Sequence, residues 1–523
     1  MSRYLNHRGP VRRLTSRPRH PSKGESMRAI VTLLTALGLC TAAAAAAIDL
    51  DPSTQHQTME GMGAAVAEWL YSQNNSQQIM DMMVQDLGAS MLRVYPEQDF
   101  EPSPGNFNPN ASRTSAQFEV VKKAVNAGIE RVLLSPFSPP AWMKTNGEIE
   151  NGGHLLADKY DDFAEYFSRY VQAMNAEMGK DVVYAVSPQN EPEWAQWYAS
   201  CVYTYEEMRD VTKAIGLRLE ADGLDCRIFG AETVVSANWG PYYGYTMQDP
   251  TAKRLLDVLA VHAYENNGVT ASSPSAQKWR MVRDAAATHG KGVWMTETSG
   301  FDAGFDDALE YANGIYTSLK YGDLSGWVFL NFNTSSGANE QEALCIDGNP
   351  KKLYYTSKNY YKWIRPGAVR ITSTSSDENV LAVAFIHPQN ETMTIVLTNT
   401  GTASTTATLN GVGLPSFTAY RSSSSENCIE VNSVSGNTVT LPAQSITTLY
   451  GTGFTVAVKN PARRSPTVPR HTAPSDGVIY NLNGRRMPRT AHGGMQTRSI
   501  HLPAGVYCVR RSVRDDAAVP VVR

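Results

Sequence analysis

Short apolar runs alternate with amphipathic stretches between residues 60 and 365. Stretches such as 158–178 and 204–221 place apolar residues at helical spacing, and each lies between two runs long enough for a buried strand. This alternation is typical of a parallel sheet, and eight strand–helix repeats over ~300 residues match a closed (β/α)8 barrel. The expected strands are residues 61–65, 90–95, 130–135, 182–187, 226–231, 256–263, 292–296 and 325–330. The sequence therefore predicts an α/β fold built on a TIM barrel over residues 60–365.

The pattern changes at about residue 366. Residues 366–453 are rich in Thr, Ser and Val, alternate apolar with polar positions and are divided by Gly or Asn turns, which predicts an attached antiparallel β-sandwich. Residues 48–59 are expected to add one more strand to this sandwich. A Pro-, Arg- and Ser-rich linker without periodicity follows at 454–475, and a small C-terminal β module is expected at 476–523.

Residues 1–47 lie ahead of the predicted fold. The apolar run that begins at Met27 carries one positive charge, is short and ends in a series of alanines, which indicates a secretory signal peptide rather than a membrane span. The Arg-rich stretch before Met27 is interpreted as the product of an upstream start codon misread as coding, and whether it is translated stays open. We expect the mature chain to begin near Ile48 and to be secreted or held at the cell surface.

Charge is strongly segregated along the chain. Residues 48–462 hold 28 Lys and Arg against 46 Asp and Glu, a net charge of −18 that the formal −3 of the whole chain conceals. An acidic body repels phosphate backbones, so nucleic acid is not an expected partner. A neutral or weakly charged substrate fits this balance better.

Five cysteines remain after the predicted cleavage, and none is spaced as in a zinc ribbon or a thioredoxin motif. Export permits a disulfide bond, and Cys201–Cys345 is the pair we expect because both residues lie in loops on the same predicted face. The alternative is that these cysteines are small buried residues. The odd count leaves at least one cysteine free or paired between chains.

Two glutamates stand where a barrel carries its chemistry, at the ends of expected strands. Glu191 follows the fourth run within QNEP, and Glu297 ends the seventh run within WMTETSG. Strands four and seven face each other across the barrel mouth, so we expect the two carboxylates to share one small site. Their pKa values are then driven apart, leaving one group protonated and one ionised, as glycoside cleavage requires. Two surface glutamates in loops are the alternative.

A carboxyl separation of about 5–5.5 Å is typical of glycosidases that retain anomeric configuration through a glycosyl-enzyme. We assign Glu191 as acid/base and Glu297 as nucleophile, and we expect Asn190 to hydrogen-bond the hydroxyl beside the reacting carbon. The sequence contains no metal-ligand cluster, phosphate loop or nucleotide fingerprint. Hydrolysis needs only water, so neither a metal nor a cofactor is expected.

Residues 48–450 resemble glycoside hydrolase family 30, a retaining family with a (β/α)8 barrel and an attached β-sandwich. The motifs that carry the resemblance are EGMG at 60–63, SPPAWMK at 138–144, NGG at 151–153, QNEP at 189–192, TE at 296–297 and RPG at 365–367. Within the family, these motifs with the later SC and EEMRD are most similar to the bacterial xylanase branch. The resemblance implies acid/base and nucleophile roles for Glu191 and Glu297, in agreement with their positions.

Other residues are expected around the two glutamates. Sugar rings carry C–H groups that pack on aromatic faces, so Trp142, Tyr264 and Trp327 are the expected platforms, with a core tryptophan as the alternative for Trp327. Arg93 is expected to orient Glu297, with a purely structural ion pair as the alternative. His262 is expected at the site as well, with a satisfied core histidine as the alternative.

One feature departs from the glucuronoxylan-specific members of the family. They carry an arginine in the loop after the eighth strand that grips the uronate side group, whereas here the loop from Asn331 has no basic residue before Lys351. Lysine is a poor replacement for a bidentate carboxylate clamp. We therefore expect cleavage of less decorated xylan or of short chains, without strict dependence on glucuronate.

The C-terminal stretches 478–485 and 502–507 resemble a sorting module of bacteria that export enzymes to the cell surface, which implies contact with export machinery. A degenerate β appendage is the alternative. The sequence thus predicts a secreted, monomeric, endo-acting β-1,4-xylanase. A hydrolase of another β-glycan, such as β-1,6-glucan or a β-glucosyl conjugate, is the alternative within this class. A non-catalytic carbohydrate-binding surface protein is the alternative outside it.

Overall fold

The computed structural model describes residues 45–234, 238–264 and 274–454, together with β22 (Ile479–Tyr480) and β23 (Cys508–Val509). Residues 1–44 of the predicted signal segment, residues 455–475 of the linker and most of the C-terminal module lie outside the described residues, whereas Ala46 and Ala47, expected to end the signal segment, belong to the first strand of the sandwich. β22 and β23 pair antiparallel. No helix in the described ranges is both long enough and apolar enough to cross a membrane.

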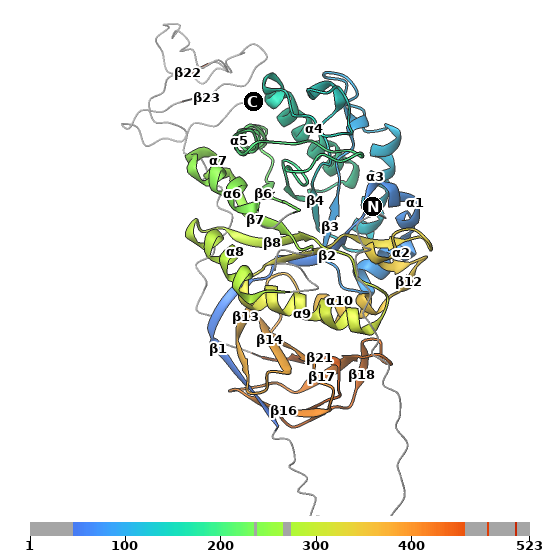
Figure 1. Cartoon of the computed structure of the whole chain (residues 1–523), viewed down its shortest axis with the longest axis vertical. Helices are drawn as coiled ribbons and strands as arrows, with labels where there is room; N and C mark the ends of the chain where they lie inside the picture. Colours follow the sequence, from blue (N-terminus) through green and yellow to red (C-terminus); the bar gives the residue numbers. More distant parts are fainter. Residues whose placement is uncertain (1–44, 235–237, 265–273, 455–478, 481–507, 510–523) are drawn as a thin grey trace, which may run out of the picture. The chain divides into compact units, whose positions relative to one another are not determined.

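Eight parallel strands close into a barrel, each hydrogen-bonded to the next and the last to the first (Figure 1). The strands are β2 (Gly61–Ala65), β3 (Met91–Val94), β4 (Arg131–Leu134), β5 (Val183–Val186), β6 (Arg227–Ala231), β7 (Leu256–His262), β8 (Gly292–Glu297) and β9 (Gly326–Phe329). Each coincides with one of the expected runs to within a residue at either end. The predicted (β/α)8 fold is therefore confirmed.

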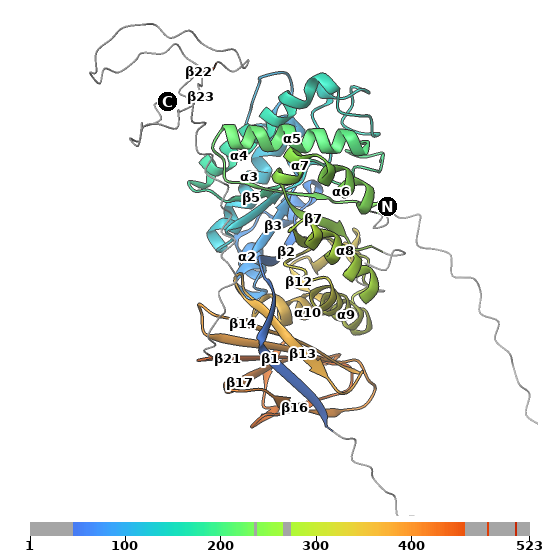
Figure 2. The ribbon, with the colours of Figure 1, turned by 90° about the vertical axis from the view of Figure 1, so that its left-hand side faces the viewer.

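Helices in the connections between strands cover the outside of the barrel (Figure 2). They are α1 (Tyr71–Asn74), α2 (Gln77–Asp81), α3 (Ser112–Ala127), α4 (Tyr160–Met178), α5 (Tyr205–Ala221), α6 (Trp239–Gln248), α7 (Pro250–Leu255), α8 (Ala276–Thr288), α9 (Phe305–Tyr321) and α10 (Lys352–Tyr361). Local chemistry sets their ends. A capping box between Thr204 and Glu207 begins α5, and Gly179, with φ of 67°, ends α4 in a left-handed turn.

Shorter elements occupy the connections. The single-turn helices are η1 (Glu68–Leu70), η2 (Met82–Asp86), η3 (Gln98–Phe100), η4 (Ala141–Met143), η5 (Ala157–Lys159) and η6 (Glu340–Glu342). The connection from β9 to α10 also folds into a small sheet of β10 (Asn331–Thr334), β11 (Ala343–Ile346) and β12 (Asn349–Pro350). This connection therefore has a defined backbone at the barrel mouth.

Side chains alternate between the two faces of the barrel strands, and this alternation corrects the prediction for Trp327. Val328 lies in the cluster that fills the barrel interior, whereas Trp327 lies in the core between the strands and the helices. Trp327 is completely buried, and its Nε1–H donates to the hydroxyl of Tyr311 on α9 at 3.0 Å. It is a core residue that cannot stack on a sugar.

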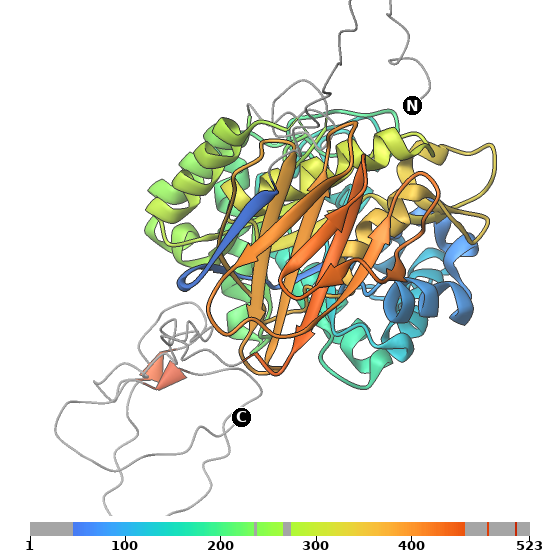
Figure 3. The ribbon, with the colours of Figure 1, turned by 90° about the horizontal axis from the view of Figure 1, so that it is seen from below.

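A ten-stranded sheet follows the barrel and contains the first described strand of the chain (Figure 3). Its strands are β1 (Ala46–Thr58), β13 (Val369–Ser375), β14 (Val380–His387), β15 (Thr392–Asn399), β16 (Thr405–Asn410), β17 (Phe417–Ser422), β18 (Ile429–Val431), β19 (Val434–Ser435), β20 (Thr438–Leu441) and β21 (Ser445–Thr452). β1 pairs antiparallel with β13 and parallel with β16. The attached β-sandwich therefore takes one strand from the residues that precede the barrel.

Polar contacts join the sandwich to the barrel. Arg370 of β13 donates to Asp323, just after α9, at 2.6 Å, and Gln57 of β1 donates to the carbonyl oxygen of Leu319 on α9 at 2.8 Å. Asn359 of α10 donates to Thr448 of β21 at 2.9 Å. These contacts fasten α9 and α10 to the sandwich.

The expected disulfide bond between Cys201 and Cys345 does not form, because both residues carry free thiols. Each is completely buried in the apolar core around the barrel, and the thiol of Cys201 lies 3.5 Å from the carbonyl oxygen of Gly153. Cys226 and Cys428 are free as well. Cys201, Cys345 and Cys428 are small buried residues, which was the alternative interpretation, whereas Cys226 is half-buried.

Candidate active site

Glu191 and Glu297 lie at the same end of the barrel, where β5 and β8 finish. Glu297 is the last residue of β8, and Glu191 stands in the loop after β5, where its backbone N–H donates to the carbonyl oxygen of Glu232 at 3.1 Å. The two residues are only 7% and 5% exposed. The backbone of Glu191 has φ of 50°, in the left-handed region that residues other than glycine rarely adopt. Such strained residues often occur at functional sites.

The two carboxyl groups are close neighbours. A carboxylate oxygen of Glu191, a carboxylate oxygen of Glu297 and a ring nitrogen of His262 all lie within 4.8 Å of one another. Retaining glycosidases hold their carboxyl groups about 5–5.5 Å apart, whereas inverting enzymes hold them about 6.5–9.5 Å apart to admit a water molecule. Closure of the barrel thus brings the two glutamates together at the spacing of a retaining pair.

Both oxygens of Glu297 accept hydrogen bonds from groups fixed in the barrel. Oε2 accepts from Arg93 Nη1 at 2.5 Å and from the hydroxyl of Tyr95 at 2.9 Å, and Oε1 accepts from the hydroxyl of Tyr264. Donors placed in this way hold the carboxylate in one orientation and favour its ionised form. Arg93 therefore lies where it can orient Glu297, and Tyr264 meets this glutamate through its hydroxyl.

Arg93 is completely buried and connects Glu297 to the opposite wall of the barrel. Its Nη2 donates to Asn190 Oδ1 at 2.6 Å, to Ser135 Oγ at 3.1 Å and to Glu232 Oε1 at 3.1 Å. A buried guanidinium needs such partners because an unpaired buried charge is costly. Arg93 thus binds the side-chain carbonyl oxygen of Asn190 and not its NH2 group.

Glu232 is a third carboxylate of the site, and it is completely buried. Burial alone would raise the pKa of Glu232, but the charge of Arg93, the contacts with His262 and the hydroxyl of Ser135 outweigh burial and lower the pKa to about 2. Glu232 is therefore ionised at neutral pH. It acts as the counter-ion that keeps a buried arginine and a buried histidine charged.

His262 ends β7 and faces all three carboxylates. Its Nδ1 lies 3.1 Å from Glu191 Oε1 and 3.9 Å from Glu297 Oε1, and its Nε2 lies 3.7 Å from Glu232 Oε1. Burial would lower the pKa of His262, but these negative neighbours outweigh burial and raise the pKa to about 10. His262 is thus an imidazolium within the site rather than a neutral core histidine.

The pKa values of the two glutamates are displaced in opposite directions. Burial, together with the charge of Glu297, raises the pKa of Glu191 above its usual value despite the opposing effect of His262. Burial acts on Glu297 in the same sense, but His262, Arg93 and Tyr264 outweigh it and lower the pKa of Glu297. One group is prepared to give a proton and the other to act as a carboxylate.

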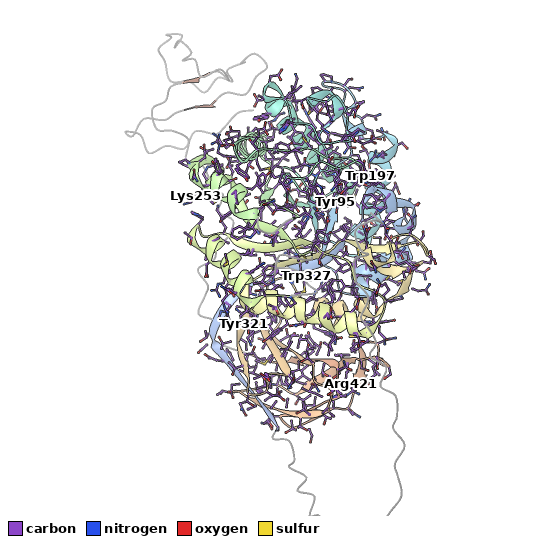
Figure 4. All side chains as sticks on the ribbon, viewed as in Figure 1. Tyr95, Trp197, Lys253, Tyr321, Trp327 and Arg421 are labelled. Carbon is purple, nitrogen blue, oxygen red and sulfur yellow. The ribbon has the colours of Figure 1, made fainter. Side chains whose placement is uncertain are left out.

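Aromatic rings extend from this centre to the surface. Tyr95 stacks on Phe137 with ring centroids 4.0 Å apart, and Phe137 also stacks on Trp69 at 5.9 Å and meets Tyr198 edge-on at 6.2 Å. Trp69 is 43% exposed and Trp197 is 72% exposed. Trp197, which is labelled in Figure 4, meets Tyr198 edge-on. Exposed rings beside a site of this kind offer faces on which sugars pack.

Trp142 lies in η4, after β4, and is half-buried. Its Nε1–H donates to the carbonyl oxygen of Glu101 at 3.0 Å, and the ammonium group of Lys159 lies 5.5 Å from its ring centroid. These contacts fix the ring in the loop but do not connect it to the glutamate pair. Its role as a sugar platform stays a prediction.

Glu191, His262 and Glu297 are near enough to one another to be considered as metal ligands. Both oxygens of Glu297 already accept hydrogen bonds, and a pKa of about 10 places protons on both ring nitrogens of His262 at neutral pH. The guanidinium of Arg93 also repels a cation. The donor set suits proton transfer better than metal binding.

Two buried carboxylates at this spacing, at the mouth of a closed (β/α)8 barrel, form the catalytic arrangement that is typical of glycoside hydrolases. Residues 90–362 match the glycosyl hydrolase family 30 TIM-barrel domain, and residues 367–449 match the glycosyl hydrolase family 30 beta sandwich domain. The chain belongs to glycosyl hydrolase family 30.

Proteins similar to this chain differ in the substrate that their names specify. The chain is 26% identical to the glucuronoxylanase XynC of Bacillus subtilis, over 69% of this chain and 81% of that protein. The solved structure of a family 30 endoxylanase from Clostridium papyrosolvens C71 is similar with a TM-score of 0.65 and 27% identity, over 78% of this chain and 100% of that one. The endo-1,6-beta-D-glucanase neg1 of Aspergillus fumigatus is 25% identical, over 67% of this chain and 80% of that protein.

Sequence reasoning missed three polar residues of the site. Tyr95 and Ser135 are the last residues of the expected runs 90–95 and 130–135, and Glu232 directly follows the run 226–231. All three obey the rule that pointed to Glu191, since chemistry in a barrel sits where strands end. The signal was present in the sequence, because each of the three stands at or directly after the end of an expected strand.

Proposed function

We propose that this chain is a secreted, retaining β-1,4-xylanase that cuts within the polymer. The observation that supports the reaction type is the pair Glu191 and Glu297. A carboxylate oxygen of Glu191 lies within 4.8 Å of a carboxylate oxygen of Glu297, and the pKa values of the two groups are displaced in opposite directions. Similarity to XynC and to the Clostridium endoxylanase supports xylan as the substrate.

In the first step, ionised Glu297 attacks the anomeric carbon while protonated Glu191 gives its proton to the leaving glycosidic oxygen. The carbon–oxygen bond to the leaving sugar breaks as the bond to Glu297 forms. His262, with Nδ1 3.1 Å from Glu191 Oε1, stabilises the carboxylate that this proton transfer creates. Arg93 and Tyr95 keep the attacking carboxylate aligned throughout.

In the second step, Glu191 acts as a base. It takes a proton from a water molecule, which attacks the same carbon and releases Glu297. Two displacements at one carbon restore its original configuration. The raised pKa of Glu191 suits both tasks, because the group must hold a proton in one step and accept one in the next.

Asn190 is proposed to bind the hydroxyl next to the reacting carbon. Arg93 holds its carbonyl oxygen at 2.6 Å, so the NH2 group is the part of the amide that remains as a donor to substrate. A hydrogen bond to this hydroxyl strengthens as the transition state develops.

The proposed substrate carries few or no uronate groups. Lys351, the first basic residue after β9, is buried, and its ammonium group donates to the carbonyl oxygens of Phe301 at 3.2 Å and Glu340 at 2.7 Å. It supports the loop from within and does not grip a carboxylate on a substrate.

Mass spectrometry of the products formed from glucuronoxylan, linear xylan and β-1,6-glucan tests this proposal. We expect a series of xylo-oligosaccharides from the xylans, produced by internal cuts, and none from the Glu297→Gln variant. Gluco-oligosaccharides from β-1,6-glucan alone would move the substrate to that polymer. Binding to xylan without any product from the unsubstituted protein would favour a non-catalytic role.

A further inference from the structure

The connection from β9 to α10 holds a carboxyl group, Glu342, that the proposed reaction does not use. Glu342 ends η6, and the carbonyl oxygen of its neighbour Gln341 accepts a hydrogen bond from the N–H of Gly300 at 3.1 Å. Gly300 lies in the loop directly after Glu297, and β8 and β9 are adjacent in the barrel. η6 therefore stands beside the proposed nucleophile.

Further contacts fix η6 in this position. The side-chain NH2 of Gln341 donates to Asp302 at 2.6 Å, and the ammonium group of Lys351 donates to the carbonyl oxygen of Glu340 at 2.7 Å. The N–H of Gly337 donates to Glu340 Oε1 at 2.8 Å. Glu342 is thus carried on a backbone that is held from both neighbouring loops.

The side chain of Glu342 is half-buried, and its Oε2 is buried with no hydrogen-bond partner among the described residues. Burial and the charge of Glu297 raise the pKa of Glu342 to about 7, although a hydrogen bond with Asn339 opposes them. Burial, followed by the charges of Glu191, Glu297 and Glu342, raises the pKa of Tyr198 on the loop after β5. The effect of Glu297 on Glu342 agrees with the hydrogen bond that joins η6 to the loop after Glu297.

Within the described part of the chain, the cations of this site are already engaged. Arg93 and His262 contact Glu297 and Glu232, and Lys351 donates to two carbonyl oxygens. Asp302 and Glu340 add further negative charge to the loops that hold η6. A carboxylate on the substrate would meet Glu342 here with none of these cations left to balance it.

We propose that Glu342 is a specificity-determining residue: its charge, which no donor or cation balances at Oε2 among the described residues, disfavours a sugar that carries a uronate beside the cleavage point. This inference rests on the proposed hydrolysis of xylan. It goes beyond that function, because Glu342 would select against the uronate side group, whereas the loop from Asn331 was expected only to lack an arginine that binds it.

The test compares kcat/KM for glucuronoxylan with kcat/KM for the same xylan after its glucuronate groups have been removed. Glu342 is ionised above its pKa, whereas the uronate is ionised throughout the range. The ratio of the two values is therefore expected to fall, in the unsubstituted enzyme, as the pH rises through about 7. In Glu342→Gln the ratio is expected to stay constant, and well above pH 7 it is expected to exceed that of the unsubstituted enzyme by about fivefold, the effect of one partly screened charge.

Glu340→Gln is the matched control, because it removes a charge from the same helix at an exposed position. Its ratio is expected to follow that of the unsubstituted enzyme. A ratio that does not change with pH in the unsubstituted enzyme would overturn the inference, and that result needs no variant. A ratio in Glu342→Gln that equals the ratio of the unsubstituted enzyme at every pH would overturn the inference as well. Absence of turnover on both xylans would instead refute the proposed function, and this inference with it.

Discussion

The barrel mouth and the β-sandwich both bury side chains, but of opposite kinds. At the mouth, Arg93, Glu232 and His262 are completely buried and charged. In the sandwich, the buried core is aliphatic, with residues such as Ile395 and Leu449. Burying aliphatic groups stabilises a fold, whereas replacing buried ion pairs with apolar groups is often neutral or stabilising. The charges at the mouth are therefore explained by chemistry rather than by stability, and variants of the two regions should separate these roles.

Glu297→Gln is expected to have the largest effect on kcat. Removing the proposed nucleophile abolishes the glycosyl-enzyme, so kcat on xylan should fall by ~10⁴-fold or more, while the melting temperature does not fall. The matched control is Glu426→Gln in the sandwich, where Glu426 pairs with Arg421. That change should leave kcat as it was. Substantial xylan cleavage by Glu297→Gln would show that the mouth is not the catalytic centre.

Glu191→Gln is expected to reduce kcat by ~10²–10⁴-fold on xylan, because it removes the proton donor. The loss should be smaller on aryl glycosides, whose leaving groups need less protonation. In the unsubstituted enzyme, activity should fall on the alkaline side as Glu191, with its raised pKa, loses its proton, and on the acid side as Glu297, with its lowered pKa, gains one. The pH profile of the variant should lack the alkaline limb, and a profile that keeps it would remove Glu191 from the acid role.

Arg93→Met is expected to lower both kcat and stability. It leaves Glu232 and Glu297 as buried carboxylates without their guanidinium, which costs about 3–5 kcal/mol of unfolding free energy. Arg370→Met is the comparison in the sandwich, since Arg370 is buried as well but pairs with the more exposed Asp323. Denaturant unfolding should show a smaller loss for Arg370→Met, with kcat unchanged. An equal fall in kcat in both variants would mean that Arg93 acts only through stability.

Leu449→Ala is expected to have the smallest effect on kcat and still a large effect on stability. Leu449 is completely buried in the aliphatic core of the sandwich, so the cavity should cost about 2–5 kcal/mol of unfolding free energy. Below the melting temperature kcat should match that of the unsubstituted enzyme. A lowered kcat under those conditions would show that the sandwich influences the barrel mouth directly.

The strand pattern of the barrel and the two principal glutamates could be predicted from the sequence. Each barrel strand is a short apolar run at regular spacing, and a glutamate at the end of such a run has few reasons to be there other than chemistry. The orientation of Trp327 could not be predicted, because the run from Gly326 to Phe329 is apolar on both faces. Alternation along this strand therefore does not show which side chains face the barrel interior and which face the helices. The absence of the Cys201–Cys345 bond could not be predicted either, since two loops on the same predicted face can hold their thiols far apart.

The network around Arg93 was harder to predict for a different reason. Its partners Asn190, Glu232 and Glu297 come from three separate strand ends, and only barrel closure brings them within 3.1 Å of one guanidinium. The sequence shows which residues end each strand. It does not show which strand ends will exchange hydrogen bonds, because that depends on side-chain length and direction within the closed barrel.

The anomeric configuration of the first-formed product tests the retaining pair most directly. Proton NMR spectra recorded in the opening minutes of xylan hydrolysis, before the sugars interconvert, report which anomer the enzyme releases. The spacing of Glu191 and Glu297 predicts that the β-anomer of the new reducing end appears first and the α-anomer follows by mutarotation. Release of the α-anomer first would contradict the double displacement and the roles assigned to both glutamates.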